Sequence, residues 1–531
     1  MYGPSLKELV QRYAQVAGTP PLPPIWAFGV WKTATGGQEH VLEEARRLRE
    51  LDVPVSAVFA YDTVDYAANV GWPYVNYAGR WAGSYPDHAS FTAALHRLGL
   101  RALTYFKADF HLDRPGYDEP ARLGFLARQA DGRPYVHPRF PVSWLDFTNA
   151  RAVEWWSRLW QRALGELNYD GGMLDLGEIL PADAYMADGK PGLETHNQYP
   201  LLYARSAWQN AMQARPNGDF VLFARAGAVG AQRFQSLQWP GDALIRWEAP
   251  GGLGSLVPAA LSFGLSGFPY WHPEVAGYLQ AGLPSDDERE LWLRWLQLAT
   301  WTSTLRDHYG DHPTYPVDFW LDDGTIAAYR DAARIHNSLV PYLYTCAAEA
   351  SRSGLPLMRF LALEAPESPR AWQEQQSYFL GPSILVAPVV EPGATSRTVY
   401  LPPGQWADFW TNELYSGGQE VSVPAPLDGG RAPAFVRAGT VLPLAAPFDS
   451  LAESELPGVR TWAGDLIVRI VAGGAGPAEF TLYDGTRLAW DGATTLRITA
   501  NARPRSVEVH LADGTVAAQR IEGAEGWIRV E

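Results

Sequence analysis

The stretch Tyr169-Asp-Gly-Gly-Met-Leu-Asp-Leu-Gly-Glu-Ile-Leu-Pro181 decides the fold class, because it has the pattern of a short buried strand that ends in charged residues. Residues 172–176 are apolar or small except for Asp175, and Glu178 follows three residues later. A continuous apolar run of this length is typical of a strand that is covered on both faces, as in a parallel sheet. Two carboxylates therefore lie where the predicted strand ends.

The same rhythm recurs from Trp26 to about Gly310, where short apolar runs alternate with amphipathic stretches. The predicted strands are Trp26–Trp31, Ala57–Tyr61, Ala102–Lys107, Gly172–Leu176, Phe220–Ala224, Leu237–Trp239, Phe268–Trp271 and Thr304–Arg306. The predicted helices are His40–Leu51, Phe91–Leu98, Arg151–Leu167, Tyr199–Ala214, Gly254–Phe263 and Asp287–Thr300. Eight such units predict a closed (β/α)8 TIM barrel. An open doubly wound sheet is the competitor, but Gly36-Gly37 is not the phosphate turn that such a sheet carries after its first strand.

Polar side chains follow successive predicted strands at their C-terminal ends. They are Asp62, Lys107, Asp109, Asp175, Glu178, Arg225, Asp242, His272 and His308. In a barrel these ends share one rim, and that rim is where active sites lie. We therefore expect these side chains to face a common cleft.

The chain changes character after a long predicted helix, Ile326–Ala350. Pro/Gly turns such as residues 401–404, 416–418 and 428–430 then separate strand-like segments such as Ser383–Val389 and Ala434–Leu442, as in a β-sandwich. Asp484-Gly485 and Asp513-Gly514 are predicted hairpin turns. We predict a catalytic barrel with a lead-in helix over residues 1–350, a proximal C-terminal β-sandwich over 351–450 and a distal small β domain over 451–531.

Composition excludes several classes of protein. The 531 residues exceed what one core supports, and the net charge of -15 lacks the basic footprint of a nucleic-acid-binding protein. The single cysteine, Cys346, leaves no disulfide framework and no cysteine-based zinc site. The first 14 residues do not resemble a signal peptide, and no apolar run is long enough to span a membrane. We expect a cytoplasmic protein, provided that the numbering starts at the natural N-terminus.

Two carboxylates are candidates for glycoside chemistry. Asp175 ends a buried strand and opens to a cleft, which suits a nucleophile, although a lone strand-end Asp is ambiguous. Asp242, in Gln238-Trp-Pro-Gly-Asp242, is flanked by Trp239 and Trp247, and an aromatic wall would raise the pKa of a proton donor. It could equally be an ordinary turn Asp. Glycosidases need two carboxyl groups about 5 to 5.5 Å apart for retention and about 6.5 to 9.5 Å apart for inversion.

Aromatic and polar residues near the same strand ends suit a sugar, which has apolar C–H faces and hydroxyl groups. Arg225, Trp271, Tyr278, Arg306 and His308 could hold hydroxyls or stack on a ring. Most of the 22 Trp residues are nevertheless expected to fill the core. His308 and His312 are four residues apart, but without an intervening Glu or a third ligand they do not predict a zinc site. We expect no metal or organic cofactor.

The chain resembles glycoside hydrolase family 31 over nearly its whole length. The lead-in from Leu9 to Trp31 is similar to that family's approach to its first strand. Leu174-Asp-Leu-Gly-Glu178 resembles its nucleophile motif, and residues 238–242 resemble its acid/base segment. The resemblance implies Asp175 as nucleophile and Asp242 as general acid/base, with Asp62, Arg225 and His308 binding sugar hydroxyls.

Within that family, the motif resembles the α-xylosidase and sulfoquinovosidase branches. The latter branch grips its substrate with a Gln, an Arg-x-x-Trp pair and a Tyr. Here these positions are Tyr61, Asn69 with Trp72, and Tyr278, so the Gln and the sulfonate-binding Arg are missing. Arg80 could substitute from the same loop. The missing bidentate Arg favours a neutral sugar. Only about 25 residues precede the first strand, where family members usually carry an N-terminal β-sandwich.

The leading hypothesis is an exo-acting, retaining α-glycoside hydrolase of the α-glucosidase or α-xylosidase type. The residues assigned to the substrate site are Asp62, Trp72, Lys107, Glu178, Arg225, Trp239, Trp271, Tyr278 and His308. Competing hypotheses are sulfoquinovosidase-like or α-galactosidase specificity, an α-transglycosylase and a non-catalytic carbohydrate-binding relative. The expected partner is an oligosaccharide or glycoside, with no nucleic acid or membrane, and the chain could be a homo-oligomer.

Overall fold

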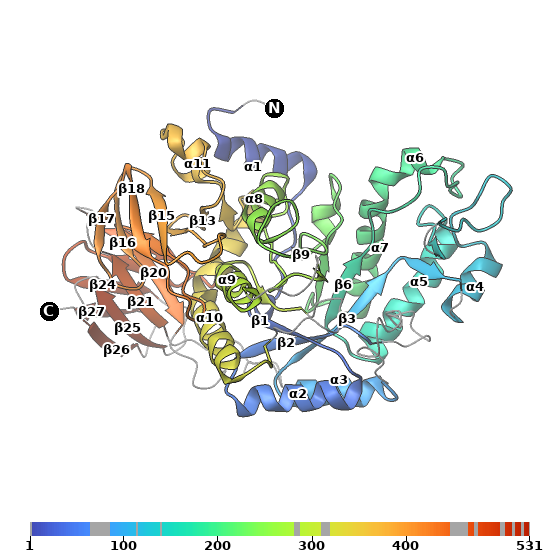
Figure 1. The fold of residues 1–531 in the computed structure, drawn as a ribbon, viewed down its shortest axis with the longest axis horizontal. Coiled ribbons are helices and arrows are strands. Elements are labelled where there is room, and N and C mark those ends of the chain that lie inside the picture. Colours follow the sequence, from blue (N-terminus) through green and yellow to red (C-terminus); the bar gives the residue numbers. More distant parts are fainter. Residues whose placement is uncertain are drawn as a thin grey trace.

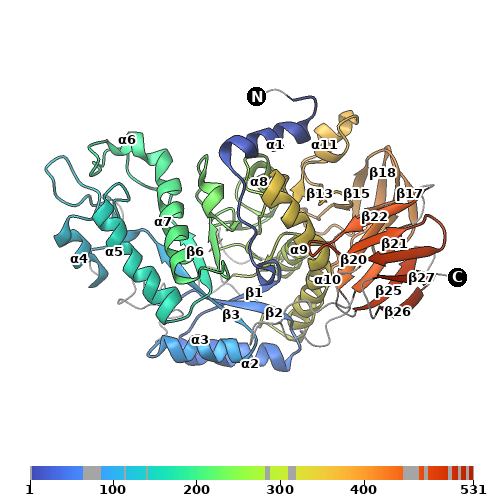
Figure 2. The same ribbon diagram turned by 180° about the vertical axis from the view of Figure 1, so that it is seen from behind.

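The computed structural model describes residues 3–63, 85–112, 115–138, 141–280, 287–308, 319–445, 466–471, 476–499, 505–511, 516–521 and 525–529. A helical and parallel-sheet part comes first along the chain, and a mainly β part follows it at the opposite end of the molecule from α4 and α5 (Figures 1 and 2). The predicted barrel followed by β-sheet modules is thereby confirmed. The limits proposed at 350 and 450 stay predictions.

Seven strands form the curled parallel sheet at the centre of the first part. In spatial order they are β11 (Leu305–Arg306), β1 (Val30–Ala34), β2 (Val55–Ala60), β3 (Arg101–Lys107), β6 (Gly171–Asp175), β7 (Val221–Ala224) and β8 (Leu237–Gln238). Their residues are almost all buried, because helices cover the outer face and the interior is packed. The register sets Lys107 beside Asp175, so the strand ends meet at one rim.

The predicted seventh strand, Phe268–Trp271, is wrong in extent. Only Trp271 forms a parallel bridge, with Gln238, and His272 N–H donates to the Gln238 carbonyl at 3.0 Å. Pro269 has no N–H to donate, which prevents a continuous ladder through this segment. Ser303 N–H donates to the Trp271 carbonyl at 3.2 Å, so the segment still joins β8 to the residues before β11 and closes the barrel.

The first strand also differs from the prediction. Residues Ile25–Phe28 form a 3-10 turn, and β1 begins only at Val30. Pro24 precedes the turn and its carbonyl accepts the Ala27 N–H at 2.9 Å. The Trp26 indole N–H donates a hydrogen bond to the Asp219 carboxylate at 2.8 Å.

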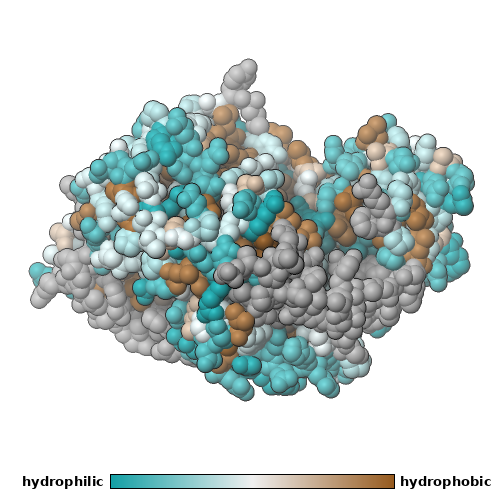
Figure 3. Space-filling model, viewed as in Figure 1, coloured by the Kyte–Doolittle hydropathy of each residue, from teal (hydrophilic) through white to brown (hydrophobic). Residues whose placement is uncertain are grey.

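The predicted helices are confirmed with changes at their ends, except that Arg151–Leu167 is an α-helix only to Trp160 and continues as a π-helix over Gln161–Glu166. The helices are α1 (Leu6–Ala17), α2 (Gln38–Glu50), α3 (His88–Arg97), α4 (Pro115–Leu123), α5 (Ala150–Trp160), α6 (Gly192–Thr195), α7 (Tyr199–Ala214), α8 (Leu256–Leu265), α9 (Glu288–Thr300), α10 (Asp323–Ser353) and α11 (Leu361–Glu364). The short helices α4, α6 and α11 were not predicted. Side chains define several ends: Asp87 caps α3, Asn149 caps α5, and Asp322 with Thr325 forms a capping box on α10. Hydrophilic residues gather over α2 and α3 on the face that Figure 3 shows.

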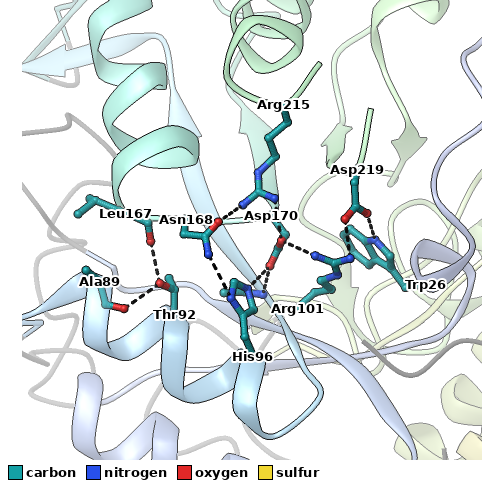
Figure 4. Close-up of polar contacts among 11 residues, drawn as sticks. Trp26, Ala89, Thr92, His96, Arg101, Leu167, Asn168, Asp170, Arg215 and Asp219 are labelled. Atoms are coloured by element: carbon teal, nitrogen blue, oxygen red, sulfur yellow. Dashed lines mark hydrogen bonds and ion pairs between the residues drawn. The ribbon is translucent and has the colours of Figure 1, made fainter. Parts of the chain in front are cut away.

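A buried polar network ties the strands together at their N-terminal ends, opposite the rim (Figure 4). Asp170, which is fully buried just before β6, contacts His96 at 2.7 Å, Arg101 at 2.8 Å and Arg215 at 3.4 Å. Arg101 reaches Asp219 as well, at 2.6 Å. Burial raises the pKa of Asp170, but His96 and Arg101 outweigh it, so its pKa lies below the ordinary value. The network stabilises the end of the barrel that carries no site.

Tryptophan fills much of the core, as expected. The largest fully buried side chains are Trp31, Trp144, Trp156, Trp160, Trp239, Trp271, Trp292, Trp295, Trp301, Trp406, Arg294 and Arg306. Among the residues that the structure describes, no helix is both long and apolar enough to cross a lipid bilayer.

The proximal β part has a six-stranded and a two-stranded sheet. The larger contains β12 (Met358–Arg359), β13 (Tyr378–Leu380), β14 (Ile384–Val386), β19 (Ala434–Arg437), β16 (Gln405–Asp408) and β17 (Leu414–Ser416), and the smaller pairs β15 (Ser396–Leu401) with β18 (Gln419–Pro424). The segment Ala434–Leu442, predicted as one strand, is divided between β19 and β20 (Thr440–Ala445). The division falls at Gly439, whose φ of 78° suits a turn.

The distal β part has two four-stranded sheets. The first contains β20, β21 (Leu466–Val471), β25 (Arg505–Leu511) and β26 (Val516–Ile521), and the second contains β22 (Ala478–Thr481), β23 (Arg487–Trp490), β24 (Thr495–Thr499) and β27 (Glu525–Arg529). The predicted hairpin at Asp484-Gly485 is confirmed between β22 and β23, and the one at Asp513-Gly514 lies outside the described residues.

Candidate active site

Asp175 is held rigidly at the end of β6. Its side chain accepts hydrogen bonds from the Tyr105 hydroxyl and, at 2.9 Å, from the Leu176 backbone N–H. Leu176 has a φ of 60°, which is uncommon for a residue with a side chain and is typical of functional sites. Both carboxylate oxygens are therefore oriented before any substrate arrives.

Arg225, which follows β7, brings three carboxylates together. Its guanidinium lies 3.2 Å from Asp175, 2.7 Å from Glu178 and 3.1 Å from Asp242. Negative charge from these three groups raises the pKa of Arg225 despite the opposing effect of burial. Because Asp175 and Asp242 contact one guanidinium, the two predicted catalytic carboxylates belong to one site.

Asp242 has the more solvent-accessible carboxylate of the pair, with 38% of its side chain exposed against 10% for Asp175. Partial burial and the negative charge of Asp175 raise the pKa of Asp242 to about 6, although Arg225 opposes them. Of the two tryptophans expected to flank Asp242, Trp239 packs inside the barrel against Phe223, with ring centroids 5.6 Å apart. A carboxyl group with this pKa holds its proton up to mildly acidic pH.

Asp62, just after the end of β2, is 1% exposed, and both of its carboxylate oxygens accept hydrogen bonds. Its carboxylate accepts the N–H groups of Gly36 and Gly37 at 2.8 and 3.2 Å and the Tyr85 hydroxyl at 2.7 Å. Burial raises the pKa of Asp62, and these hydrogen bonds oppose the increase. The Gly36-Gly37 pair, to which sequence reasoning gave no role, thus positions this carboxylate.

Three rings form an aromatic wall between β2 and β11. The His308 ring stacks on Tyr278 with centroids 5.1 Å apart and meets Tyr61 edge-on at 4.8 Å, and the two tyrosine hydroxyls lie 3.3 Å apart. Burial and the nearby Arg306 lower the pKa of His308 well below its ordinary value, so the imidazole is neutral near pH 7. A neutral imidazole can donate a hydrogen bond to a sugar hydroxyl or accept one from it.

Glu274 is a residue that sequence reasoning missed. It is 2% exposed, and its carboxylate lies 2.5 Å from the Arg306 guanidinium and 3.8 Å from the His308 ring nitrogen. Burial raises the pKa of Glu274 to about 7, and the charge of Asp242 contributes, although Arg306 opposes both. The sequence feature that could have indicated it is His272-Pro-Glu274, which places a carboxylate just after the seventh predicted strand, much as Asp175 lies at the end of the fourth.

The remaining predicted residues are dispersed. Trp239, Trp271 and Arg306 are each at most 1% exposed and lie in the barrel interior, and His272 is buried beside Arg306 at 3.5 Å. Lys107 is 9% exposed and pairs with Asp109 at 3.2 Å. Trp72, Asn69, Arg80 and His312 lie outside the described residues. Within the described ranges, no group of three His, Cys, Asp or Glu side chains is placed to hold a metal ion.

These features define a class, a (β/α)8-barrel protein with clustered carboxylates at the rim. Residues 20–346 match the model of the glycosyl hydrolases family 31 TIM-barrel domain, and residues 354–442 match that of the family's C-terminal domain. The chain belongs to glycosyl hydrolase family 31.

Relatives named for different activities resemble the chain. A sulfoquinovosidase of Escherichia coli is 32% identical over 81% of the chain and 63% of its own length, and an α-xylosidase of Saccharolobus solfataricus is 27% identical over 84% and 59%. The solved cycloalternan-forming enzyme of Listeria monocytogenes matches 100% of the chain and 56% of its own with a TM-score of 0.85 at 22% identity, which shows the fold alone. The chain thus spans less than two thirds of the length of these relatives.

Proposed function

We propose that the chain is an exo-acting, retaining α-glycoside hydrolase that releases a terminal α-linked neutral sugar by double displacement. The observation that carries this proposal is the contact of both Asp175 and Asp242 with the single guanidinium of Arg225. One guanidinium spans the separation at which two carboxyl groups act on one glycosidic bond, about 5 to 9.5 Å, a range that includes both retention and inversion; the resemblance of the motifs to a retaining family favours retention. Membership in family 31 supports the same chemistry.

In the first step a carboxylate oxygen of Asp175 attacks the anomeric carbon. The bond from that carbon to the glycosidic oxygen breaks, and the oxygen takes the proton of Asp242. A covalent ester between Asp175 and the sugar forms, and the aglycone leaves as an alcohol. The pKa of about 6 makes Asp242 a proton donor in mildly acidic solution, while the hydrogen bonds from Tyr105 and Leu176 keep Asp175 oriented.

In the second step Asp242, now ionised, removes a proton from water. The water oxygen attacks the anomeric carbon from the side that the aglycone left, and the ester bond to Asp175 breaks. One water is consumed, both carboxyl groups return to their starting states, and the configuration is retained. Asp62 and His308 would orient the glycone hydroxyls, since one is a fixed acceptor and the other is a neutral ring.

The charge balance around the site supports a neutral glycone. Among the described residues near the strand ends, Arg225 is already paired with three carboxylates and Lys107 pairs with Asp109, whereas Arg80 lies outside the described residues. A sulfonate would have to compete with these carboxylates for Arg225 or Lys107. A neutral sugar, glucose or xylose, needs no such exchange.

A sulfosugar remains the second candidate, because the chain is 32% identical to a sulfoquinovosidase. A panel of aryl α-glucoside, α-xyloside, α-galactoside and α-sulfoquinovoside separates the candidates by kcat/KM. A preference for the sulfoquinovoside would overturn the neutral-sugar proposal without affecting the proposed mechanism.

The mechanism is tested with Asp175→Ala and Asp242→Ala, and exposed Asp131→Ala serves as a control for loss of a surface carboxylate. Each catalytic variant is expected to lose at least about 100-fold in kcat on aryl α-glycosides, the effect of removing an acid/base or nucleophile. Asp242→Ala should lose less on substrates with very acidic leaving groups, which need no proton donor. Near-normal turnover by either variant would refute the assignment.

Two further measurements distinguish a hydrolase from a transglycosylase and from a protein that only binds carbohydrate. Product analysis at high substrate concentration separates hydrolysis from transglycosylation, since a transglycosylase forms longer oligosaccharides. A mechanism-based cyclitol should label Asp175, and a folded protein that is not labelled would favour a non-catalytic carbohydrate-binding relative.

A further inference from the structure

Trp527 is an exposed tryptophan on the outer face of the distal β part. It lies on β27, the edge strand of the sheet that orders β22, β23, β24 and β27, and 54% of the residue is exposed. Its neighbour Ile528 is 2% exposed and packs with Leu488 and Leu496 in the core between the two distal sheets. Because side chains alternate along a strand, Trp527 points away from that core.

The strand register places polar side chains beside the exposed ring. Trp527 is paired with Arg497 on β24, and Arg497 is paired in turn with Ala489 on β23. The Arg497 guanidinium carbon lies 4.9 Å from the centroid of the Trp527 ring, and its nitrogen lies 3.2 Å from the Glu525 carboxylate. The guanidinium packs against the ring, and the small Ala489 leaves the sheet flat beside it.

Two ion pairs lie on this face. Arg497 is paired with Glu525, and Arg487 on β23 is paired with Glu479 on β22. A polyanion such as a nucleic acid or an acidic lipid surface would have to compete with these two carboxylates for Arg497 and Arg487, which makes it a poor fit to the paired charges beside Trp527. A ligand with an apolar face for the ring and many hydroxyls for paired charges fits, and pyranose sugars have both.

We propose that the outer face of β24 and β27, centred on Trp527, is a surface site that binds a chain of neutral sugars. Trp527 stacks on the C–H face of one pyranose, and Arg497 and Glu525 exchange hydrogen bonds with hydroxyls of the same or the next unit. This site is separate from the candidate active site, because β27 lies at the outer end of the β part in both views, whereas β6 lies in the barrel (Figures 1 and 2).

Such a site would hold a polymer near the enzyme between successive cleavages. The inference goes beyond the proposed function, since binding at the distal sheet needs neither Asp175 nor Asp242. It can therefore be tested by binding alone.

The test is native gel electrophoresis through gels that contain soluble starch, dextran or xyloglucan. The proteins compared are the full chain, Trp527→Ala, Trp527→Tyr and Trp372→Ala. Trp372 is the matched control, because it is 49% exposed on the other β part and its indole N–H donates to the Pro366 carbonyl at 3.0 Å. All four are run in the Asp175→Ala background, so that no polymer is consumed.

We expect at least one polymer to retard the chain, Trp527→Ala to lose about tenfold in affinity, which is a contact of about 1.4 kcal/mol, and Trp372→Ala to lose nothing. Trp527→Tyr should keep most of the binding, because it keeps a ring. Equal retardation of Trp527→Ala and the parent chain, or no retardation by any of the three polymers, would overturn the proposal. Dissociation of an oligomer by Trp527→Ala in sedimentation velocity would overturn it as well, and would assign this face to contact between copies. Polymer binding by a chain that hydrolyses no aryl glycoside would leave this inference standing while the proposed function fails.

Discussion

Replacing Glu178 by Gln is expected to move the alkaline limb of the pH profile of kcat/KM to lower pH. In the wild-type chain that limb should lie near pH 6, because Asp242 must carry a proton and its pKa is about 6. At one pH unit above the pKa about a tenth of the molecules remain protonated, so kcat/KM should fall about tenfold per unit on this limb.

The direction of the shift follows from the charges. The negative charge of Glu178 favours the neutral form of Asp242 and so raises its pKa. Gln keeps the size of the side chain and removes the charge. It also leaves Arg225, which lies 2.7 Å from Glu178, with fewer carboxylates to share, and a more available guanidinium stabilises ionised Asp242. Both effects lower the pKa of Asp242.

The magnitude follows from Coulomb's law. Two groups on one guanidinium lie about 6 Å apart, and at an effective dielectric constant of about 40 to 80, suited to a partly exposed pair, they interact by about 0.7 to 1.4 kcal/mol. The limb should therefore shift down by about 0.5 to 1 pH unit.

The assay is the initial rate on an aryl α-glycoside well below KM, from pH 4 to pH 9, at constant ionic strength. Glu420→Gln is the matched control, because Glu420 pairs with Arg370 in the proximal β part and its side chain is 53% exposed. A limb that stays in place in Glu178→Gln, or that moves to higher pH, would refute the electrostatic account. A merely structural role for Glu178 would lower the whole profile without moving it.

Three further predictions concern stability. Asp170→Asn should lower the free energy of unfolding by about 3 to 5 kcal/mol, since it leaves buried cations without a counter-charge. Because the pKa of Asp170 is depressed in the folded state, its stabilising contribution is present above about pH 4 and is lost as pH falls through the folded pKa. The urea unfolding curves of the wild type and the variant should therefore converge in acid. Glu274→Gln should cost less at pH 8 than at pH 5, by about 2 kcal/mol, because the raised pKa of Glu274 makes wild-type stability fall as pH rises from about 4.5 through 7, whereas the uncharged Gln is insensitive to this change; an equal cost at both pH values would contradict the pKa of about 7. Gly354→Ala should lower the melting temperature more than Gly393→Ala. Both glycines have positive φ, of 76° and 71°, which costs a residue with a side chain about 1 to 2 kcal/mol, but only at Gly354 would an added Cβ clash with a neighbouring Cβ, that of Ala14. Equal melting temperatures would show that the backbone moves to relieve the contact.

The local features of this protein could be predicted from its sequence. Apolar runs followed by carboxylates marked the end of β6 at Asp175 and the residues after β8 at Asp242. Helix periodicity gave α7 its observed limits of Tyr199 and Ala214. Such features depend on neighbours within a few residues, and their physical cause is present in the local sequence.

The arrangement of the site was decided by tertiary structure. No spacing in the sequence indicates that Arg225 contacts three carboxylates, that Gly36 and Gly37 hold Asp62, or that Glu274 pairs with Arg306 inside the barrel. These contacts join residues on different strands, and the closure of the barrel alone sets their distances. The same closure sets the pKa of Asp242, because burial and the charge of Asp175 act through space and not along the chain.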